Sequence, residues 1–462
     1  MLNYFNFKKF NGEFLLTNDL GRYIFLKPEE FRDFLADQPV QDPAQEKRLI
    51  KNAFRYETST EAFTADHRFF LRHAKRYVFS GTQLHIFVVT TACNGHCVYC
   101  QAQNGVQEPH AMMSRETARK AVDLALQSPA ESLTFEFQGG EPTLNFDVIR
   151  YIVKYSRANS RGKDIRYSLV TNFTTLSDEM LDFIKANHIG LSTSLDGCAA
   201  VHNHNRPLKN GDATYDKVVE TLKKVRDNGL DTGAIETTTR YSLSHAREIV
   251  DTYVDLGFHN IFLRPLTPLG SANHNWKQIG YEPEEFLEFY TEAFNYILEK
   301  NLSGYQLSEN YAAIMLQKII TGEAQNYMEL RSPCGAALGQ VAYYCDGNVY
   351  TCDEGRMIAE MGNDIFRLGT VDNTYDELMN SKVCRAVCSK SITESLPSCS
   401  DCVYQPYCGV CPAVNYMLYQ DLEEKTPNNY HCRINKGILD LIFTKLQEDD
   451  YAIRQILRSW FE

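Results

Sequence analysis

Two hydrophobic periodicities alternate along the middle of the chain, between residues 84 and 268. Short runs rich in Val, Ile, Leu, Phe and Thr, residues that favour strands, recur through this region. Between them lie segments with apolar residues at helical spacing; near 214–228, for example, Val218 and Val225 share one face. Strands that alternate with helices predict parallel βαβ units.

Six strands and five helices follow from this pattern. The predicted strands are Leu84–Thr91, Leu133–Gln138, Ile165–Thr171, Gly190–Leu195, Ala234–Thr239 and Ile261–Pro265. The predicted helices lie near 114–127, 145–159, 178–188, 214–228 and 244–256. Six units are too few for a full eight-stranded barrel, so the pattern fits either an open sheet or a partial barrel.

Unusual polar segments follow five of these strands. They are "ACNGHCVYC" at 92–100, "QGGEP" at 138–142, "TN" at 171–172, "STSLDG" at 192–197 and "LRPLTP" at 263–268. In parallel α/β folds the C-terminal strand ends share one edge of the sheet, where catalytic and binding residues lie. Any one of these segments alone would be an ordinary turn. Five at one edge predict an active site.

The first of these segments carries Cys93, Cys97 and Cys100 in the spacing C-x3-C-x2-C. A structural zinc ion takes four ligands, and His96 lies too close in the loop to complete a tetrahedral site easily. A [4Fe–4S] cube has four irons, each with one external ligand. Three cysteines therefore leave one iron open, as an open position marks a catalytic metal site.

Composition and charge exclude several other classes. The net charge of the 462 residues is −12 without a long Lys/Arg run, which argues against a nucleic-acid partner. No segment has the apolar length of a membrane span, and the N-terminus lacks an apolar signal region. We therefore expect a cytoplasmic protein without a membrane partner. In that compartment its fourteen cysteines favour metal ligands over disulfides; only Cys198 is isolated, and we interpret it as a small buried hydrophobe.

The cysteine spacing after the first strand, with "GGEP" after the second, resembles the radical S-adenosylmethionine superfamily. The resemblance implies that S-adenosylmethionine binds the open iron and is cleaved reductively to a 5′-deoxyadenosyl radical, which abstracts hydrogen from a substrate. It also implies residue roles. Cys93, Cys97 and Cys100 would ligate the cluster, Tyr99 would lie near the adenine, Gly139, Gly140 and Glu141 would bind the methionyl ammonium, and Ser194 and Arg206 would contact the ribose and carboxylate.

Residues 334–432 hold a second set of cysteines, whose spacing resembles the SPASM extension of that superfamily. One departure is that two residues, not three, separate Cys408 from Cys411. The resemblance implies two auxiliary [4Fe–4S] clusters and hence three in all: an outer one held by Cys399, Cys402, Cys408 and Cys432, and an inner one held by Cys334, Cys352 and Cys411. For the fourth inner ligand Cys345 is nearest in sequence, and Cys384, Cys388 or an open position are the alternatives. Zinc ribbons would use similar spacing.

Asp353 follows Cys352 directly. In sulfatase maturases, which belong to the same superfamily, an aspartate at that position takes a proton during substrate oxidation. The resemblance therefore implies that Asp353 is a general base. Capping of a turn is the alternative role, and Glu354 and Arg356 are equally placed to contact a substrate.

The first 80 residues contain no cysteine. We expect a hairpin with its turn at Asn18-Asp19, a helix from about Pro28, and helices near 44–55 and 60–76. A hairpin followed by three helices is the outline of a winged-helix peptide-recognition module, and equally of a plain cap on the barrel.

Over most of its length the chain is similar to the His-Xaa-Ser system radical maturases, judged on four segments: "LLTNDLGRYIFL", "TFEFQGGEPTLNFD", "SPCGAALGQVAYYCDGNVYTCDEGRM" and "YCGVCPAVNY". The similarity implies a ribosomally made precursor peptide as substrate, a side-chain cross-link as product, and an electron donor such as flavodoxin or ferredoxin. A sulfatase-type maturase and a non-catalytic zinc scaffold are the alternatives.

The expected architecture is an α/β fold with a partial (β/α)6 TIM-like radical S-adenosylmethionine barrel. Its expected divisions are an N-terminal module at 1–80, the barrel at 81–270, a helical bridge at 271–333, and a cysteine-rich SPASM domain with C-terminal helices at 334–462.

Overall fold

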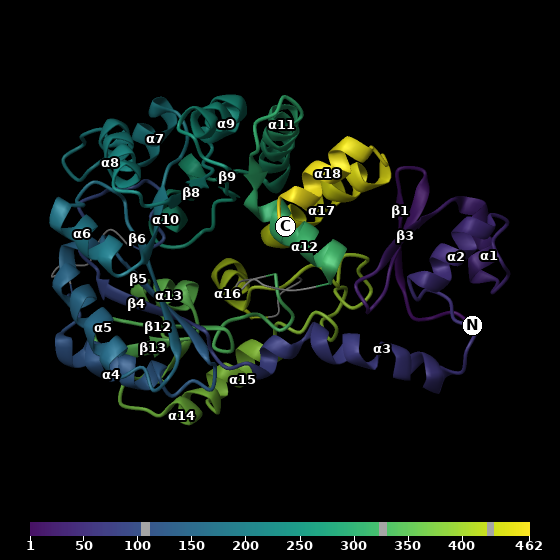
Figure 1. The fold of residues 1–462 in the computed structure, drawn as a ribbon, viewed down its shortest axis with the longest axis horizontal. Coiled ribbons are helices and arrows are strands. Elements are labelled where there is room, and N and C mark those ends of the chain that lie inside the picture. The colour runs from purple at the N-terminus through teal and green to yellow at the C-terminus, as the bar shows by residue number, and fades with distance from the viewer. Residues whose placement is uncertain (103–110, 323–329, 423–428) are drawn as a thin grey trace.

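A nine-stranded sheet organises the chain, in the order β10-β8-β7-β6-β5-β4-β12-β13-β14 (Figure 1). The computed structural model describes residues 1–102, 111–322, 330–422 and 429–462. Six parallel strands follow the predicted order: β4 (Leu84–Thr90), β5 (Ser132–Gly139), β6 (Asp164–Val170), β7 (Ile189–Ser194), β8 (Thr232–Thr237) and β10 (Leu263–Arg264). The predicted α/β class with parallel βαβ units is therefore confirmed.

Helices of the predicted βαβ units cover the parallel strands. They are α4 (Arg115–Ala125), α5 (Phe146–Ala158), α6 (Asp178–Ala186), α8 (Tyr215–Asp227) and α9 (Ala246–Asp255). A short further helix, α7 (Ala199–Asn205), was not predicted. Cys198 immediately precedes α7 and is half-buried, so it is less enclosed than the small buried hydrophobe that was expected. All seven residues of β4 are buried, as expected for a central strand covered on both faces.

The sixth predicted strand, Ile261–Pro265, differs from the observed structure. It is divided into β9 (Asn260–Ile261) and β10, and only β10 joins the main sheet. β9 instead pairs in parallel with β11 (Ser308–Glu309), which comes from the region after the barrel. The last barrel unit is thus shared with the helical bridge.

The cysteine-rich region continues the barrel sheet. β12 (Gln340–Tyr343) pairs in parallel with β4, and β13 (Asn348–Tyr350) and β14 (Arg367–Thr370) follow as antiparallel strands. Gly347 at the turn between β12 and β13 has φ +92°, a conformation that glycine adopts without strain. The predicted division between barrel and SPASM region therefore does not coincide with a break in the sheet.

The N-terminal module contains three strands rather than one hairpin. They are β1 (Asn6–Phe10), β2 (Glu13–Thr17) and β3 (Tyr23–Leu26), followed by α1 (Pro28–Leu35), α2 (Pro43–Lys51) and α3 (Thr60–Ala74). The predicted turn near Asn18 lies between β2 and β3. The hairpin missed from sequence turns at Asn11-Gly12, whose φ values of 46° and 86° are those that an Asn-Gly hairpin turn requires.

This module packs against the C-terminal end of the chain. The ring of Phe443, in α17 (Tyr430–Gln447), contacts the rings of Tyr23 and Phe25 in β3. The Thr17 hydroxyl donates to the Val403 carbonyl over 2.6 Å. In Figure 1, α3 runs from the module toward the barrel beneath the C-terminal region.

The remaining helices connect and cover these parts. They are α10 (Ser271–Ile279), α11 (Pro283–Leu302), α12 (Asn310–Thr321), α13 (Asp353–Glu360), α14 (Tyr375–Met379), α15 (Lys382–Ser389), α16 (Pro412–Tyr419) and α18 (Tyr451–Ser459). Within the described ranges, none of the helices combines the length and apolarity needed to cross a membrane.

Glu309 ties the helical bridge to the barrel. Its carboxylate caps α12 by accepting from the Ala312 backbone N–H over 2.7 Å, and it also accepts from the Leu263 N–H over 3.2 Å and from the Tyr290 hydroxyl. The side chain is fully buried, and burial raises its pKa to about 7.

We expect Glu309 to make stability depend on pH. Its raised pKa means that the folded state holds a proton between about pH 4.5 and 7 where the unfolded state does not, so this contribution is complete at low pH and is lost as pH rises through 7. The loss corresponds to about 3 kcal/mol. Urea unfolding across this range should show the decline in the native protein and a weaker one in Glu309→Gln. Equal slopes in the two proteins would contradict it.

Candidate active site

Cys93, Cys97 and Cys100 lie together in the loop after β4. A Cβ atom built on Gly95 would be 3.6 Å from Sγ of Cys93 and 3.8 Å from Sγ of Cys97. Burial raises the pKa of Cys100 to about 12, and the neighbouring Cys97 and Cys93 add to this effect. His96 is exposed, unlike the two thiols on either side of it. The structure therefore groups the three cysteines without the histidine.

A single metal ion and an iron–sulfur cube place different demands on cysteines. Among the residues that the structure describes, no three His, Cys, Asp or Glu side chains are positioned to hold one ion. The ligands of a [4Fe–4S] cube bind separate irons, so they surround a volume rather than converge on one point. Three grouped thiols match a cube with one open iron.

Gly139 and Gly140 bring the end of β5 against the start of the cysteine loop. A Cβ on Gly139 would lie 2.4 Å from the Thr90 carbonyl oxygen, and one on Gly140 would lie 2.3 Å from that of Ala92. The Gly140 N–H donates to the Thr90 carbonyl over 2.8 Å. Only glycine permits this approach. Both glycines thus fix the backbone beside Cys93.

Glu141 is fully buried among hydrogen-bond donors. It accepts from the Thr143 N–H and hydroxyl over 3.1 and 2.6 Å, from the Thr171 hydroxyl over 2.7 Å, and from the Asn172 N–H over 2.8 Å. Burial raises its pKa, while these bonds oppose the rise. The carboxylate therefore joins the ends of β5 and β6. Four protein donors already bind its oxygens, which the family resemblance had assigned to the methionyl ammonium of the cofactor.

Tyr99 is held by charged partners on the opposite side of the barrel. Its hydroxyl donates to both carboxylate oxygens of Asp196, over 2.9 and 2.8 Å, and accepts from Nη1 of Arg206 over 2.6 Å. Tyr99 and Asp196 are buried, and Arg206 is half-buried. Ser194 is also half-buried and ends β7, two residues before Asp196. The structure thus brings Tyr99 and Arg206 together and leaves Ser194 on the neighbouring strand end.

The predicted gathering of strand-end segments is confirmed. Asn172 Nδ2 donates to Asn94 Oδ1 over 2.9 Å, which links "TN" to the cysteine loop. The Ser271 N–H, just after "LRPLTP", donates to the Cys100 carbonyl over 2.8 Å. Together with the Glu141 and Tyr99 contacts, these bonds join the first four segments at one edge. Ser271 brings the chain that follows the fifth segment to the same edge.

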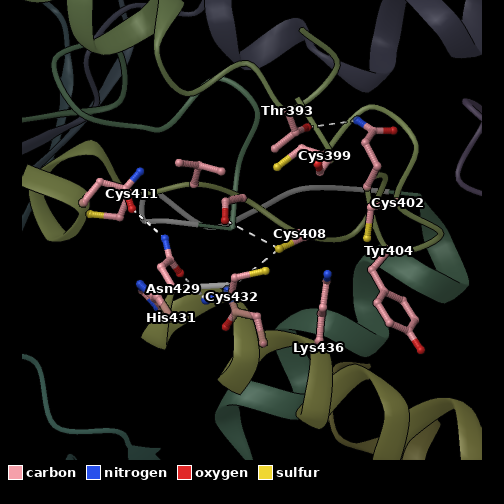
Figure 2. A pocket seen from close by; sticks show the side chains of 16 residues that line it. Thr393, Cys399, Cys402, Tyr404, Cys408, Cys411, Asn429, His431, Cys432 and Lys436 are labelled. Carbon is pink, nitrogen blue, oxygen red and sulfur yellow. Dashed lines mark hydrogen bonds between the residues drawn. The ribbon is translucent and has the colours of Figure 1, made fainter. Parts of the chain in front are cut away.

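The outer set of cysteines borders a cavity of about 520 Å³. Cys399, Cys402, Cys408 and Cys432 all line it, and Cys411 lies apart from these four at its far side (Figure 2). Burial raises the pKa of Cys432 to about 12, and the other three thiols raise it further while Lys436 lowers it. The structure therefore brings together the four residues predicted for one cluster.

The inner set borders a second cavity, of about 300 Å³. Cys334, Cys352 and Cys411 line it together with Gln340 and Glu354. The Cys352 Sγ accepts the Gly355 N–H over 3.3 Å at the N-terminus of α13. Burial raises the pKa of this thiol well above its usual value, and the hydrogen bond opposes the rise. Cys411 borders both cavities.

The three candidates for a fourth inner ligand do not line this cavity. Cys345 is buried in the main core, and its thiol donates to the Val88 carbonyl of β4 over 3.1 Å. Cys384 and Cys388 contact each other on one face of α15. Cys388 lies near enough to Cys334 for the charge of Cys334 to raise its pKa. The structure thus separates Cys345 from the group to which its spacing assigned it.

Asp353 lies between the inner cavity and the barrel. Its Oδ1 accepts from Nε of Arg356 over 2.8 Å, and Nη1 of Arg356 donates to Glu360 over 2.9 Å. The Arg356 side chain is only 1% exposed. Across the sheet, burial raises the pKa of Glu136 in β5, and the charge of Asp353 raises it further. Asp353 is therefore fixed by a buried guanidinium next to a second carboxyl.

Sequence reasoning missed three of these residues. Asp196 was visible in "SLDG" but could equally have been a turn residue. Asn94 carried no distinguishing pattern inside the cysteine loop. Glu136 interrupts an apolar strand, "TFEF", which is the one sequence feature that could have marked it as facing a polar site.

Residues 87–263 match the family model of the radical SAM superfamily. The chain contains a radical SAM domain. The loop cysteines and the two closely packed glycines lie inside the matched range, and they have the donor set and the backbone approach that S-adenosylmethionine and a [4Fe–4S] cluster require. The cysteine loop and the strand-end residues described above therefore lie within the radical SAM domain.

Similarity to sulfatase-maturating enzymes extends beyond the radical SAM domain. The chain is 24% identical to a cysteine-type anaerobic sulfatase-maturating enzyme of Clostridium novyi over 324 residues, 68% of this chain and 83% of that protein. It is 22% identical to a serine-type enzyme of Bacteroides thetaiotaomicron over 370 residues, 75% of this chain and 85% of that protein. The chain is thus related to maturases of both types.

Solved structures confirm the fold. The structure of anSMEcpe with bound AdoMet matches with a TM-score of 0.68 and 22% identity, over 79% of this chain and 98% of that one. Streptococcus suis SuiB bound to precursor peptide SuiA matches with a TM-score of 0.55 and 13% identity, over 91% of this chain and 96% of that one. At these identities the likeness shows the architecture alone.

Proposed function

We propose that this chain is a radical S-adenosylmethionine enzyme that modifies a ribosomally made precursor peptide, with a side-chain cross-link as its product. One observation carries the proposal. Cysteines spread from residue 93 to residue 432 gather into three separate groups, one at the strand-end edge of the radical SAM domain and two around adjoining cavities. That arrangement supports one cluster for radical generation and two auxiliary clusters.

Cys93, Cys97 and Cys100 would hold the first cluster. When bound, this cluster and S-adenosylmethionine supply a 5′-deoxyadenosyl radical, which removes a hydrogen atom from the substrate. Gly139 and Gly140 keep the backbone close to the cofactor position, because any side chain there would collide with Thr90 or Ala92. These contacts position the cofactor before the reaction starts.

The buried Tyr99–Asp196–Arg206 group would border the same cofactor. The Tyr99 hydroxyl makes its hydrogen bonds with Asp196 and Arg206, so the ring is fixed in place. A guanidinium at this edge suits a carboxylate ligand. Glu141 contributes indirectly, by joining the strand ends that carry the site.

Asp353 would accept the proton that the substrate loses when it is oxidised. A proton acceptor must be held at a defined position, and Arg356 provides this by donating to Oδ1. The location of Asp353, one residue after the inner-cavity residue Cys352 and near Glu136 of the barrel, supports a role between the radical site and the inner cluster.

The other cavity residues would bind the auxiliary clusters. Cys399, Cys402, Cys408 and Cys432 would hold the outer one, and Cys334, Cys352 and Cys411 the inner one. Burial raises the pKa of Cys399 and of Cys432 to about 12, and the cation of Lys436 opposes part of this rise. An electron donor such as flavodoxin or ferredoxin would supply the reducing electron.

A sulfatase-type maturase is the second candidate, supported by the similarity to cysteine-type and serine-type enzymes. The length of chain that each structural likeness covers favours the peptide-modifying enzyme. The anSMEcpe likeness leaves about a fifth of this chain uncovered, whereas the likeness to SuiB, a structure bound to a precursor peptide, spans 91% of the chain. A small precursor gene beside this one would also favour peptide modification.

Anaerobically purified protein tests the proposal directly. Given S-adenosylmethionine and dithionite, it should form 5′-deoxyadenosine, and with the neighbouring precursor peptide it should yield a product lighter by two hydrogens for each cross-link. Oxidation of a cysteine or serine in a sulfatase-derived peptide instead would favour the second candidate. A colourless protein that contains zinc and no iron would be the non-catalytic scaffold.

We expect Cys345→Ser and Cys352→Ser to differ sharply. Cys352 lines the inner cavity, so its loss should lower the iron content by up to about four atoms per chain. Cys345 contacts the Val88 carbonyl in the core, so its conservative replacement should leave iron and the cluster's electron paramagnetic resonance signal unchanged. Loss of iron in Cys345→Ser, with the fold intact by circular dichroism, would restore Cys345 as a ligand.

A further inference from the structure

A groove with a volume of about 480 Å³ lies between the N-terminal module and the C-terminal helices. One wall comes from β3 and α2, and the other from α12, α17 and α18, which lie near one another in Figure 1. Its lining residues are Arg22, Tyr23, Phe25, Arg48, Asn52, Ile319, Ile320, Leu446, Tyr451, Arg454, Gln455 and Arg458. None comes from the barrel strands or from the three cysteine groups, so the groove is distinct from the site described above.

The groove is strongly basic although the chain as a whole is acidic. Its lining contains four arginines and no carboxylate, against a net charge of −12 for the chain. Arg454 pairs with Asp449 at its margin. Within the described part of the chain, no carboxylate lies within ion-pairing distance of Arg22, Arg48 or Arg458. These guanidiniums therefore have charge available for an anionic partner.

The arginines converge on one place in the groove. Arg454, Arg48 and Arg458 come from α18 and α2, yet all three act on the Tyr23 hydroxyl and lower its pKa against the larger effect of burial. Arg48 and Arg458 are exposed, so their charged ends face solvent in the groove. Two elements that are distant in sequence thus present one cationic surface.

Apolar side chains accompany the charges. Phe25 and Ile320 are half-buried in the lining, and the Tyr451 side chain is 77% exposed, whereas Ile319 and Leu446 are buried. At about 480 Å³ the groove falls within the roughly 300–1,000 Å³ range of ligand sites. Arginine forks bind carboxylates in pairs, and the exposed Tyr451 ring offers an apolar contact beside them.

We propose that this groove binds an acidic segment of a polypeptide that also carries apolar residues. The inference rests on the proposed function for the identity of that polypeptide, which is the precursor peptide at a position away from its modified residue. Charge complementarity would then select the substrate, and the α18 wall would take part in recognition along with the N-terminal module.

A fluorescein-labelled peptide of alternating glutamate and leucine provides a direct test, with fluorescence anisotropy on the full-length protein as the measurement. The native protein should bind it, and added salt should weaken the binding because exposed charges are screened. The double variant Arg48→Glu/Arg458→Glu should bind at least about tenfold more weakly. A matched charge reversal on the barrel, Arg166→Glu/Lys217→Glu, should bind as the native protein does. An alternating lysine and leucine peptide should not bind.

Several outcomes would overturn the inference. They are no binding by the native protein, equal binding by the native and groove-reversed proteins, or tight binding of ATP or inorganic phosphate with no peptide binding. Should the double glutamate variant unfold in a thermal melt, Arg48→Gln/Arg458→Gln replaces it. Failure of the proposed function is a separate result, because it appears as a lack of 5′-deoxyadenosine formation by the native protein, whatever the groove binds.

Discussion

Replacing Cys93, Cys97 and Cys100 together by alanine should abolish 5′-deoxyadenosine formation and remove about four of about twelve irons per chain. The physical reason is that the three thiols are the only cysteines grouped at the strand-end edge of the described barrel residues. Iron analysis and chromatography of the anaerobic reaction would measure both quantities. The auxiliary sites should keep their iron, because their cysteines line separate cavities.

Cys198→Ala is the matched control for that variant. Cys198 is a half-buried cysteine at the start of α7, and it lines neither of the two cysteine cavities. Its replacement should leave iron content and 5′-deoxyadenosine formation at the native level. Activity that survives the triple change would rule out the radical mechanism.

Replacing Cys399 and Cys402 by alanine should separate cleavage of S-adenosylmethionine from peptide modification. Both residues line the outer cavity, in a part of the chain remote from the cysteine loop of the barrel. We expect the loss of about four irons, slower but continuing formation of 5′-deoxyadenosine, and a fall in peptide modification at least about tenfold larger, equivalent to about 1.4 kcal/mol of extra barrier. Mass spectrometry of the peptide and chromatography of the nucleoside would give the two rates.

An equal fall of the two rates in a folded protein would contradict this assignment, since it would tie the outer cluster to the cleavage step. Asn6 Nδ2 donates to the carbonyls of Ser400 and Cys402, so the variant also needs a thermal melt to show that the module remains attached. Asn6→Ala, which removes those bonds and keeps both thiols, is the corresponding structural control.

Local patterns predicted most of the barrel. β4 and β5 have strongly apolar cores, and α8 begins and ends within a residue of its predicted limits because its apolar face and Gly229 define it. The sequence predictions were least accurate for short turns and strands. The Asn11-Gly12 turn gave a clear hairpin signal that was overlooked, and the strand near Ile261 is divided because β9 takes a partner from beyond the barrel.

Sequence spacing predicted which cysteines lie close together in the fold, provided that only a short stretch of chain separates them. The four outer cysteines and the three loop cysteines are grouped as expected. Spacing did not show that Cys345, two residues after β12, contacts β4. The pairing of β12 with β4 is a long-range contact that no local pattern contains. The basic groove could not be predicted from sequence either, because Arg48 and Arg458 are far apart along the chain and line one groove only after folding.

That strand pairing has a consequence for how the protein is made. The hydrogen bond between Cys345 and Val88 closes a loop of 257 positions. While the ribosome is still producing that loop, β4, the most apolar strand of the sheet, has an exposed edge on the side that β12 will fill. Open apolar edges promote aggregation, and contacts this distant form slowly. The last third of the chain therefore shields the barrel during biosynthesis, and a nascent chain that stops before residue 340 carries an unprotected sheet.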